Sequence, residues 1–296
     1  MSLHRPAHPA WRIRDGELRF RPVPLLIGIV NVTPDSFSDG GAHLEPGAAV
    51  EHGLRLVEEG ADLLDVGGES TRPGATPVDL DQELDRILPV IEALVDRAGV
   101  PVSVDTTKSG VARVALEAGA RIVNDVSALR FDPQLAEVAA EYGAGLILMH
   151  MRGEPRTMQA DPRYDDLLGE IGAELDQAAG AAREAGVDAA AIVLDPGIGF
   201  GKTIQDSYRL LAGIDRLGGW GYPILIGHSR KSFLDPERRH PAGERLPESI
   251  AAGVLAALGG ASVLRVHDVA GHRRALEVLE RWGEARGTVA VEREER

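Results

Sequence analysis

Eight short apolar runs alternate with longer segments whose apolar residues recur at helical spacing, and this alternation constrains the fold more than any other feature. Strands that alternate with helices form parallel sheets, because each helix carries the chain back to the start of the next strand. The runs predicted to be strands are residues 24–32, 62–66, 102–105, 121–125, 145–150, 191–195, 223–227 and 262–266. Eight such units predict an α/β protein with the (β/α)8 TIM-barrel fold.

The segments between the predicted strands are rich in alanine and leucine and carry polar residues at the complementary helical positions. They predict outer helices, among them residues 46–59, 81–96, 109–118 and 133–142. Gly60 and Gly119 follow two of these helices, where a left-handed residue ends a helix before the next strand. A doubly wound open sheet is the alternative, but the glycine-rich dinucleotide motif after the first strand is missing.

The ends of the chain differ from the barrel repeat. Residues 11–20 alternate about Asp15 and Gly16, a pair typical of tight hairpin turns. We therefore predict that residues 1–23 form an extension with a short β-hairpin at the N-terminal end of the barrel. Residues 24–284 are predicted to form a single barrel domain, and the charged residues 285–296 a frayed tail.

Charge and composition exclude several classes of function. Lys and Arg number 32 and Asp and Glu number 46, so the net charge is −14 and no nucleic-acid partner is expected. The chain has no cysteine, which excludes disulfides, thiolate metal sites and a cysteine nucleophile. No apolar run reaches the roughly 18 residues of a membrane span, so we expect a cytoplasmic enzyme without membrane association.

Rare residue types gather where the predicted strands end. The lysines are Lys108, Lys202 and Lys231, the asparagines are Asn31 and Asn124, and each lies at or just beyond the end of a predicted strand. Any single polar residue there could simply cap a helix or satisfy a turn. Because the active site of a TIM barrel lies at the carboxyl ends of its strands, the set as a whole predicts a functional site.

Several motifs occupy these strand ends in order along the chain. They are Asn-Val-Thr-Pro-Asp-Ser-Phe-Ser-Asp-Gly-Gly from Asn31, Asp-Val-Gly-Gly-Glu-Ser-Thr-Arg-Pro-Gly from Asp65, Ser-Val-Asp-Thr from Ser103, Asn-Asp-Val-Ser from Asn124, Met-His-Met from Met149, Asp-Pro-Gly-Ile-Gly-Phe-Gly-Lys from Asp195, Ser-Arg-Lys-Ser-Phe from Ser229 and Arg-Val-His-Asp-Val from Arg265. Through them the chain resembles the dihydropteroate synthase family.

The resemblance implies a reaction of the folate pathway. It implies that 7,8-dihydropterin-6-ylmethyl diphosphate and p-aminobenzoate combine to give 7,8-dihydropteroate and diphosphate, with Mg²⁺ as cofactor. Diphosphate is a good leaving group and an electron-rich pterin can delocalise a methylene cation, so we expect a dissociative substitution without a covalent enzyme intermediate. A homodimer is also expected.

The resemblance assigns the pterin to residues from four strands and from the segment after a fifth. Asp195 would accept hydrogen bonds from the guanidine-like edge of the pterin, which a carboxylate matches with two acceptors. Asp105, Asn124 and Lys231 would pair with the remaining ring atoms. Met149 would pack against the ring, although a place in the protein core is an equal alternative.

The resemblance assigns the diphosphate and the metal to the ends of the first and last strands. Asn31 would contact Mg²⁺ and diphosphate, because its carbonyl is a hard oxygen ligand. Arg265 and His267 would stabilise the charge that develops on the leaving diphosphate. Asp35, in a loop with Pro34 and two glycines, would stabilise positive charge on the pterin methylene carbon.

The p-aminobenzoate site is assigned to the segments after three strands, with Thr71, Arg72, Pro73, Phe200 and Ser229. The fork of Arg72 suits either the carboxylate of p-aminobenzoate or diphosphate, and the sequence leaves that choice open. Residues 197–202 lack the spacing of a Walker motif, which disfavours ATP binding. Neither Lys202 nor the variable position His228 receives a role from the resemblance.

Taken together, the predicted catalytic residues are Asp35, Thr71, Arg72, Lys231, Arg265 and His267. Two alternatives remain open. The first is a pterin-binding methyltransferase of the methyltetrahydrofolate type, which would not need Arg72, Lys231 or the first loop. The second is a non-catalytic pterin-binding paralogue, which loss of catalytic-loop residues would reveal.

Overall fold

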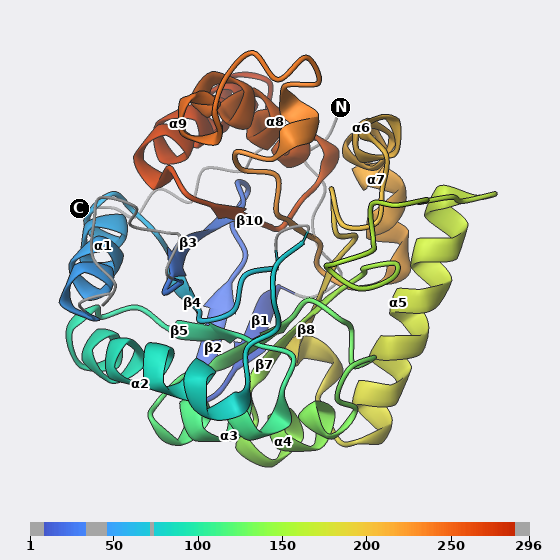
Figure 1. Cartoon of the computed structure of the whole chain (residues 1–296). Helices are drawn as coiled ribbons and strands as arrows, with labels where there is room; N and C mark the ends of the chain where they lie inside the picture. The colour runs from blue at the N-terminus through green and yellow to red at the C-terminus, as the bar shows by residue number, and fades with distance from the viewer. Residues whose placement is uncertain (1–8, 34–45, 72–73, 288–296) are drawn as a thin grey trace.

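The computed structural model describes residues 9–33, 46–71 and 74–287, and within them eight parallel strands form a barrel inside a ring of helices (Figure 1). The barrel strands are β3 (Leu25–Asn31), β4 (Leu63–Gly67), β5 (Val102–Asp105), β6 (Ile122–Asp125), β7 (Gly145–Met149), β8 (Ile192–Asp195), β9 (Leu225–Ile226) and β10 (Val263–Val266). A parallel bridge between Leu194 and Ile224 joins β8 to β9 and closes the sheet. The predicted (β/α)8 fold is confirmed.

The helices of the ring follow the strands in turn. They are α1 (Pro46–Glu58), α2 (Leu80–Arg97), α3 (Ser109–Glu117), α4 (Gln134–Tyr142), α5 (Leu167–Glu184), α6 (Ile204–Ala212), α7 (Ile214–Leu217), α8 (Leu246–Gly259) and α9 (Val269–Ala285). Gly60 and Gly119 follow α1 and α3 with φ of 99° and 104°, so both helices end through the left-handed residue that the sequence predicts. No helix in the described part of the chain is long and apolar enough to cross a membrane.

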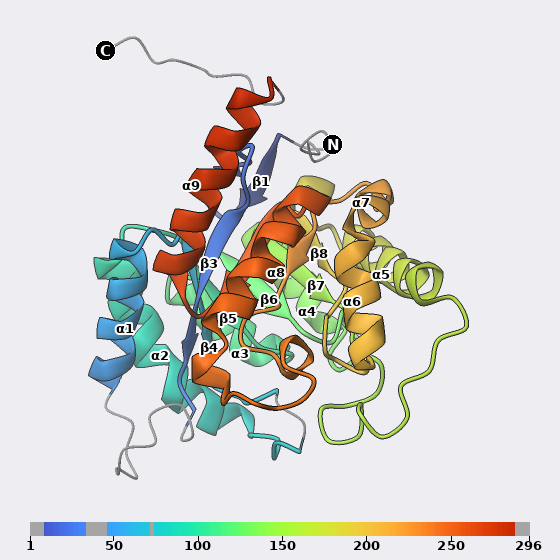
Figure 2. The same ribbon diagram turned by 90° about the horizontal axis from the view of Figure 1, so that it is seen from above.

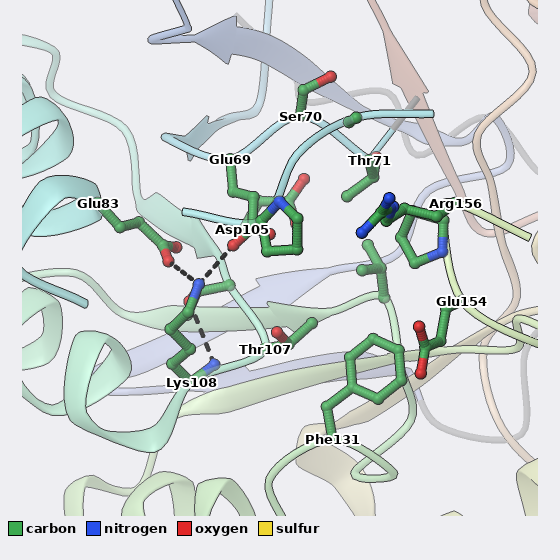
Figure 3. Close-up of a pocket in the computed structure, with 15 residues that line it drawn as sticks. Glu69, Ser70, Thr71, Glu83, Asp105, Thr107, Lys108, Phe131, Glu154 and Arg156 are labelled. Atoms are coloured by element: carbon green, nitrogen blue, oxygen red, sulfur yellow. Dashed lines mark hydrogen bonds and ion pairs between the residues drawn. The ribbon is translucent and has the colours of Figure 1, made fainter. Parts of the chain in front are cut away.

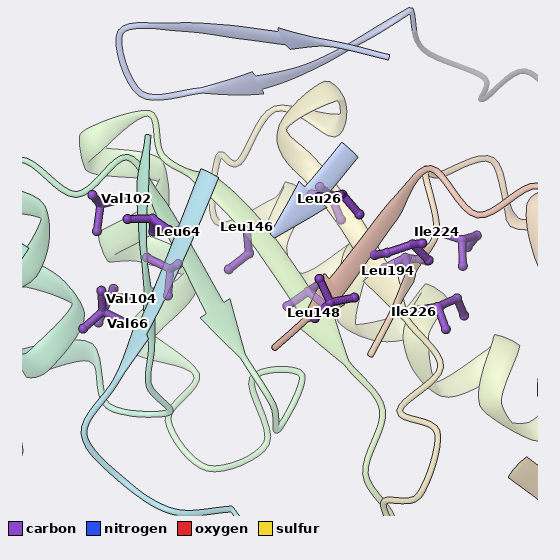
Figure 4. Close-up of a cluster of buried hydrophobic side chains, with 14 of the residues drawn as sticks. Leu26, Leu64, Val66, Val102, Val104, Leu146, Leu148, Leu194, Ile224 and Ile226 are labelled. Atoms are coloured by element: carbon purple, nitrogen blue, oxygen red, sulfur yellow. The ribbon is translucent and has the colours of Figure 1, made fainter. Parts of the chain in front are cut away.

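Two apolar layers hold the barrel together, because successive side chains of a strand point to opposite faces. The outward layer packs against the helices (Figure 4) and includes Leu26, Leu64, Val104, Leu148 and Ile226. The inward layer fills the barrel near the N-terminal ends of the strands and includes Leu25, Ile27, Leu63, Ile122, Ile147, Val193, Leu225 and Val263. The inward positions farther along the strands are largely polar, which creates a buried polar region at the other end of the barrel.

A hairpin of β1 (Ala10–Ile13) and β2 (Gly16–Arg19) covers the N-terminal end, as the sequence predicts. Trp11 and Ile13 join the inward apolar layer, and Trp11 Nε1 donates to the Ala191 carbonyl at 2.8 Å. Asp15 turns the hairpin with φ of 57°. Figure 2 shows this hairpin at one end of the barrel and the segments before α5 and α8 at the opposite end, where the strands carry their polar residues.

Candidate active site

An arginine between two carboxylates lies at the centre of the polar end of the barrel. Arg265 of β10 donates from Nε to Asp65 Oδ2 at 2.6 Å and from Nη2 to Asp105 Oδ2 at 2.8 Å. Asn124 of β6 donates from Nδ2 to the same Asp65 oxygen at 2.9 Å. All four residues share the inward register of their strands, so the sheet itself brings them together.

The charge of Asp105 is poorly stabilised in this cluster. Burial raises the pKa of Asp105 to about 7; Arg265 opposes the shift and the neighbouring Asp65 adds to it. The Asp105 side chain remains 12% exposed, so a ligand above the barrel can reach it. Asp105 can therefore gain or lose a proton near neutral pH, and a bound ligand that donates to it would favour the ionised form.

Asp195 and Lys231 are two further buried charged groups of the site, and they attract each other. A Cβ on Gly227 would lie 3.7 Å from Asp195 Oδ2 and 3.9 Å from Lys231 Nζ, so the two groups flank this glycine. Burial raises the pKa of Asp195, while burial lowers the pKa of Lys231 to about 8 against the attraction of Asp195. Asp195 Oδ1 accepts from the Gly197 amide at 2.7 Å, which leaves the other carboxylate oxygen toward Lys231 and the cluster.

The loops after β9 and β10 are joined at the rim. The Ser229 hydroxyl accepts from the His267 amide at 3.2 Å and lies 3.1 Å from His267 Nδ1. Arg230 donates from Nε to Asp268 Oδ2 at 2.8 Å. Asn31 ends β3 on the same rim, where its backbone pairs with Gly67 of β4.

A cavity of about 270 Å³ adjoins the charged cluster at Asp105 (Figure 3). It shares Thr71 and Asp105 with the polar end of the barrel and is bounded on its far side by Phe131, Glu154, Pro155 and Arg156. Lys108 lines it but donates to the buried Glu83 at 2.6 Å and also to Glu69. The carboxylates therefore hold Lys108 in the wall of the cavity.

Comparisons with known proteins agree with this geometry. The family model described as "Pterin binding enzyme" matches residues 27–267. The dihydropteroate synthase of Escherichia coli (strain K12) is 44% identical over 257 residues, which cover 87% of this chain and 91% of that protein. The chain therefore belongs to the dihydropteroate synthase family. The matched residues 27–267 include the whole charged cluster and all the barrel strands apart from the first two residues of β3.

Solved members of the dihydropteroate synthase family share the same architecture. The Xanthomonas albilineans enzyme with 4-aminobenzoic acid is 47% identical, with a TM-score of 0.85 over 93% of this chain and 98% of that one. The same enzyme in complex with 7,8-dihydropteroate is 46% identical, with a TM-score of 0.79 over 89% of this chain and 94% of that one.

The structure brings most of the residues predicted for this dihydropteroate synthase family member to one end of the barrel. Asp105, Asn124, Asp195 and Lys231 all lie there, as predicted for a pterin site. Met149 is buried beside Val126, Met151 and Met158, with Phe200 packed against this apolar cluster. The structure thus places Met149 in a small core next to the site, and its contact with a pterin stays a prediction.

Two features of the site differ from the sequence expectations or lie beyond them. Arg265 lies within β10, inside the predicted strand 262–266, but its pairing to two carboxylates inside the barrel was not predicted. Asp35, Arg72 and Pro73 lie outside the described residues, so their predicted roles stay predictions. Thr71 is described and lines the cavity beside Asp105.

Asp65 is the residue whose part in the site the sequence analysis missed. It is fully buried and accepts from both Arg265 and Asn124, so it orients two members of the cluster. The spacing of the sequence could have indicated that Asp65 points into the barrel. Asp65 stands two residues after the inward Leu63 and therefore shares its face of the strand. A carboxylate at such a position requires a cationic or hydrogen-bonded partner inside the barrel.

Proposed function

We propose that this chain condenses 7,8-dihydropterin-6-ylmethyl diphosphate with p-aminobenzoate to give 7,8-dihydropteroate and diphosphate, as dihydropteroate synthases do. The observation that carries the proposal is the set of Asp105, Asn124 and Asp195 on inward strand positions, joined by Lys231 from the segment after β9, at the carboxyl end of a closed barrel. A pterin presents adjacent N–H donors and a ring carbonyl, which these carboxylates, amide and ammonium complement.

The arrangement suits a dissociative substitution. Arg265 of β10 and His267 of the following loop are two residues apart, so both can face the departing diphosphate above the bound pterin. As the carbon–oxygen bond breaks, the diphosphate takes the electron pair and the pterin methylene becomes electron-poor. The amine of p-aminobenzoate then attacks that carbon and loses its proton, so positioning and electrostatics supply the catalysis.

We also propose Mg²⁺ as the cofactor, held mainly by the substrate. The described residues contain no group of three or more His, Cys, Asp or Glu side chains that could hold a metal ion. A single neutral ligand such as Asn31 fits a cation that keeps several waters and binds substrate phosphates. Bound in this way, Mg²⁺ would offset the negative charge of the leaving diphosphate.

Turnover of purified protein tests the proposed function. Incubation with dihydropterin diphosphate, Mg²⁺ and p-aminobenzoate should release diphosphate and 7,8-dihydropteroate in equal amounts. A methyltransferase would form neither product and bind methyltetrahydrofolate, and a non-catalytic paralogue would bind the pterin without turnover. Arg72→Ala should slow the reaction much more than it weakens pterin binding, since an arginine fork at the second substrate acts mainly after the pterin is seated.

The order of binding is expected to depend on Mg²⁺. Dihydropterin diphosphate should bind only weakly without the metal, because its phosphates then meet the site without their cation. p-Aminobenzoate should bind appreciably only when dihydropterin diphosphate, or a pterin together with free diphosphate, is already bound. Calorimetric titration with and without Mg²⁺ measures both effects, and tight p-aminobenzoate binding to the protein alone would contradict this order.

We propose a homodimer whose interface includes α6 and α8, which pack side by side (Figure 2). Ile204 and Tyr208 of α6 are 46% and 40% exposed, and Leu255 of α8 is 56% exposed, so apolar side chains are left uncovered on both helices. A second copy of the chain would bury this surface. Sedimentation velocity should show a dimer that Leu255→Glu shifts toward monomer; a wild-type monomer at micromolar concentration would refute the proposal.

A further inference from the structure

Lys202 is buried behind the site. Its relative exposure is 3%, although it lies close to the residues assigned to both substrates. Its Nζ lies 2.8 Å from His150 Nδ1 and donates to the carbonyls of His150 at 3.1 Å and Phe200 at 3.0 Å. Burial lowers the pKa of Lys202, and these three atoms surround its amino nitrogen with almost no access to solvent.

These bonds cross a seam where two loops touch through their backbones. A Cβ on Gly197 would lie 1.9 Å from the His150 carbonyl oxygen, and a Cβ on Gly201 would lie 2.4 Å from that of Arg152. No side chain fits at either glycine, so the loop after β8 rests directly on the segment after β7. Lys202 bonds to a carbonyl on each side of this seam and holds the two segments together.

Side chains fix four successive carbonyls of the loop after β8. Lys231 donates to Ile198 at 2.5 Å, Gln159 to Gly199 at 2.5 Å, Lys202 to Phe200 at 3.0 Å and Tyr164 to Gly201 at 2.8 Å. The Nζ of Lys231 also lies 4.3 Å from the centre of the Phe200 ring. The position of this loop therefore sets the position of Phe200 and of the Lys231 ammonium.

His150 extends the contact to the outer helix. Burial lowers the pKa of His150 to about 2, and the nearby Lys202 adds to this shift, so the ring is neutral. A neutral ring that accepts from Lys202 at Nδ1 carries its proton on Nε2, which lies 3.1 Å from Glu174 Oε2 of α5. Arg152 donates to the other oxygen of Glu174 at 2.7 Å, which links the same glutamate to the seam.

We propose that Lys202 is a positioning residue for the second substrate: through the Phe200 carbonyl and His150 it fixes the loop after β8, and with it the Phe200 ring assigned to the p-aminobenzoate site. This proposal rests on the function proposed above. Of the four residues assigned to the pterin, Asp105, Asn124 and Asp195 belong to strands, and Lys231 has its own bond to the Ile198 carbonyl. Loss of the Lys202 bonds should therefore affect p-aminobenzoate far more than the pterin.

Lys202→Met tests the proposal, because methionine fills much of the same space without a donor. We expect the KM for p-aminobenzoate to rise at least about tenfold, the loss of roughly one or two buried hydrogen bonds. The affinity for dihydropterin diphosphate should change by less than about threefold, which corresponds to less free energy than one hydrogen bond typically contributes. Hydrogen exchange, which needs no turnover, should become faster at the amides of residues 197–201.

Thr203→Ala is the matched control on the adjacent residue. Thr203 caps α6, where its Oγ1 accepts from the Asp206 amide at 3.0 Å, and loss of this cap should destabilise the fold without touching the loop carbonyls. The control should leave both the KM for p-aminobenzoate and the exchange of residues 197–201 as in the wild type. If Lys202→Met and Thr203→Ala gave the same KM for p-aminobenzoate and the same exchange of residues 197–201, Lys202 would only stabilise the core, and the proposal would be overturned.

Two further outcomes are distinguishable. If the wild type forms no dihydropteroate, the proposed function fails, while the exchange comparison still decides whether Lys202 fixes the loop. If Lys202→Met does not fold, Lys202→Leu also removes the N–H donors and is measured in the same way. A folded Leu variant with wild-type KM and wild-type exchange overturns the proposal, and raised values of both support it.

Discussion

Asp195→Asn is expected to weaken binding of dihydropterin diphosphate by more than about 100-fold, from a lost charge-assisted bond and an unpaired donor. The amide would keep one acceptor but turn an NH₂ group toward a donor of the pterin. Burial raises the pKa of Asp195, so the folded protein disfavours its charge, and the variant should melt no lower than the wild type. Calorimetry measures the affinity, and thermal unfolding measures the stability.

Asp188→Asn provides the matched control for the same chemical change. Asp188 lies at the opposite end of the barrel, where it pairs with Arg12 of the hairpin and its side chain is 45% exposed. Its replacement should leave pterin binding unaltered. If folded Asp195→Asn protein bound the pterin as tightly as this control, Asp195 would not be the acceptor of the donor edge.

The fold could be predicted from the sequence because the helical spacing and the strand alternation of apolar residues are both local patterns. Four predicted helices begin and end close to α1, α2, α3 and α4, and each predicted strand contains the observed one except residues 62–66, which end one residue before β4 does. The hairpin at Asp15 could be predicted equally well, since the residues within a two-residue turn determine its conformation. Closure between β8 and β9 follows from the count of eight units rather than from any local signal.

The site was accessible only in part. Which strand ends carry polar residues can be read from the sequence, but which of them pair depends on contacts between distant segments. Arg265 and Asp65 are 200 residues apart, and nothing local to either residue indicates the other. Lys202 shows the same limit. The scarcity of lysine in the chain marked Lys202 as unusual, but the side chain points between the loops after β7 and β8, and that direction depends on how the two loops pack.

Arg265→Met is expected to destabilise the fold by about 3–5 kcal/mol, the usual cost of leaving a buried charge without its partner. The Arg265 side chain is 20% exposed and holds both Asp65 and Asp105, so its loss leaves two carboxylates facing each other inside the barrel. Arg265 lowers the pKa of Asp105 in the wild type, and its removal should therefore raise that pKa above about 7.

The pH dependence of Arg265→Met separates this electrostatic cause from a loss of packing. A carboxyl whose pKa is higher in the folded than in the unfolded state destabilises the fold increasingly as pH rises from its unfolded pKa, about 4, to its folded pKa. The deficit in unfolding free energy, measured with urea, should thus be larger at pH 8 than at pH 5. Adding Asp65→Asn should recover part of it, because one of the two facing charges is removed; a deficit equal at both pH values and unchanged in the double variant would show that Arg265 acts through its volume alone.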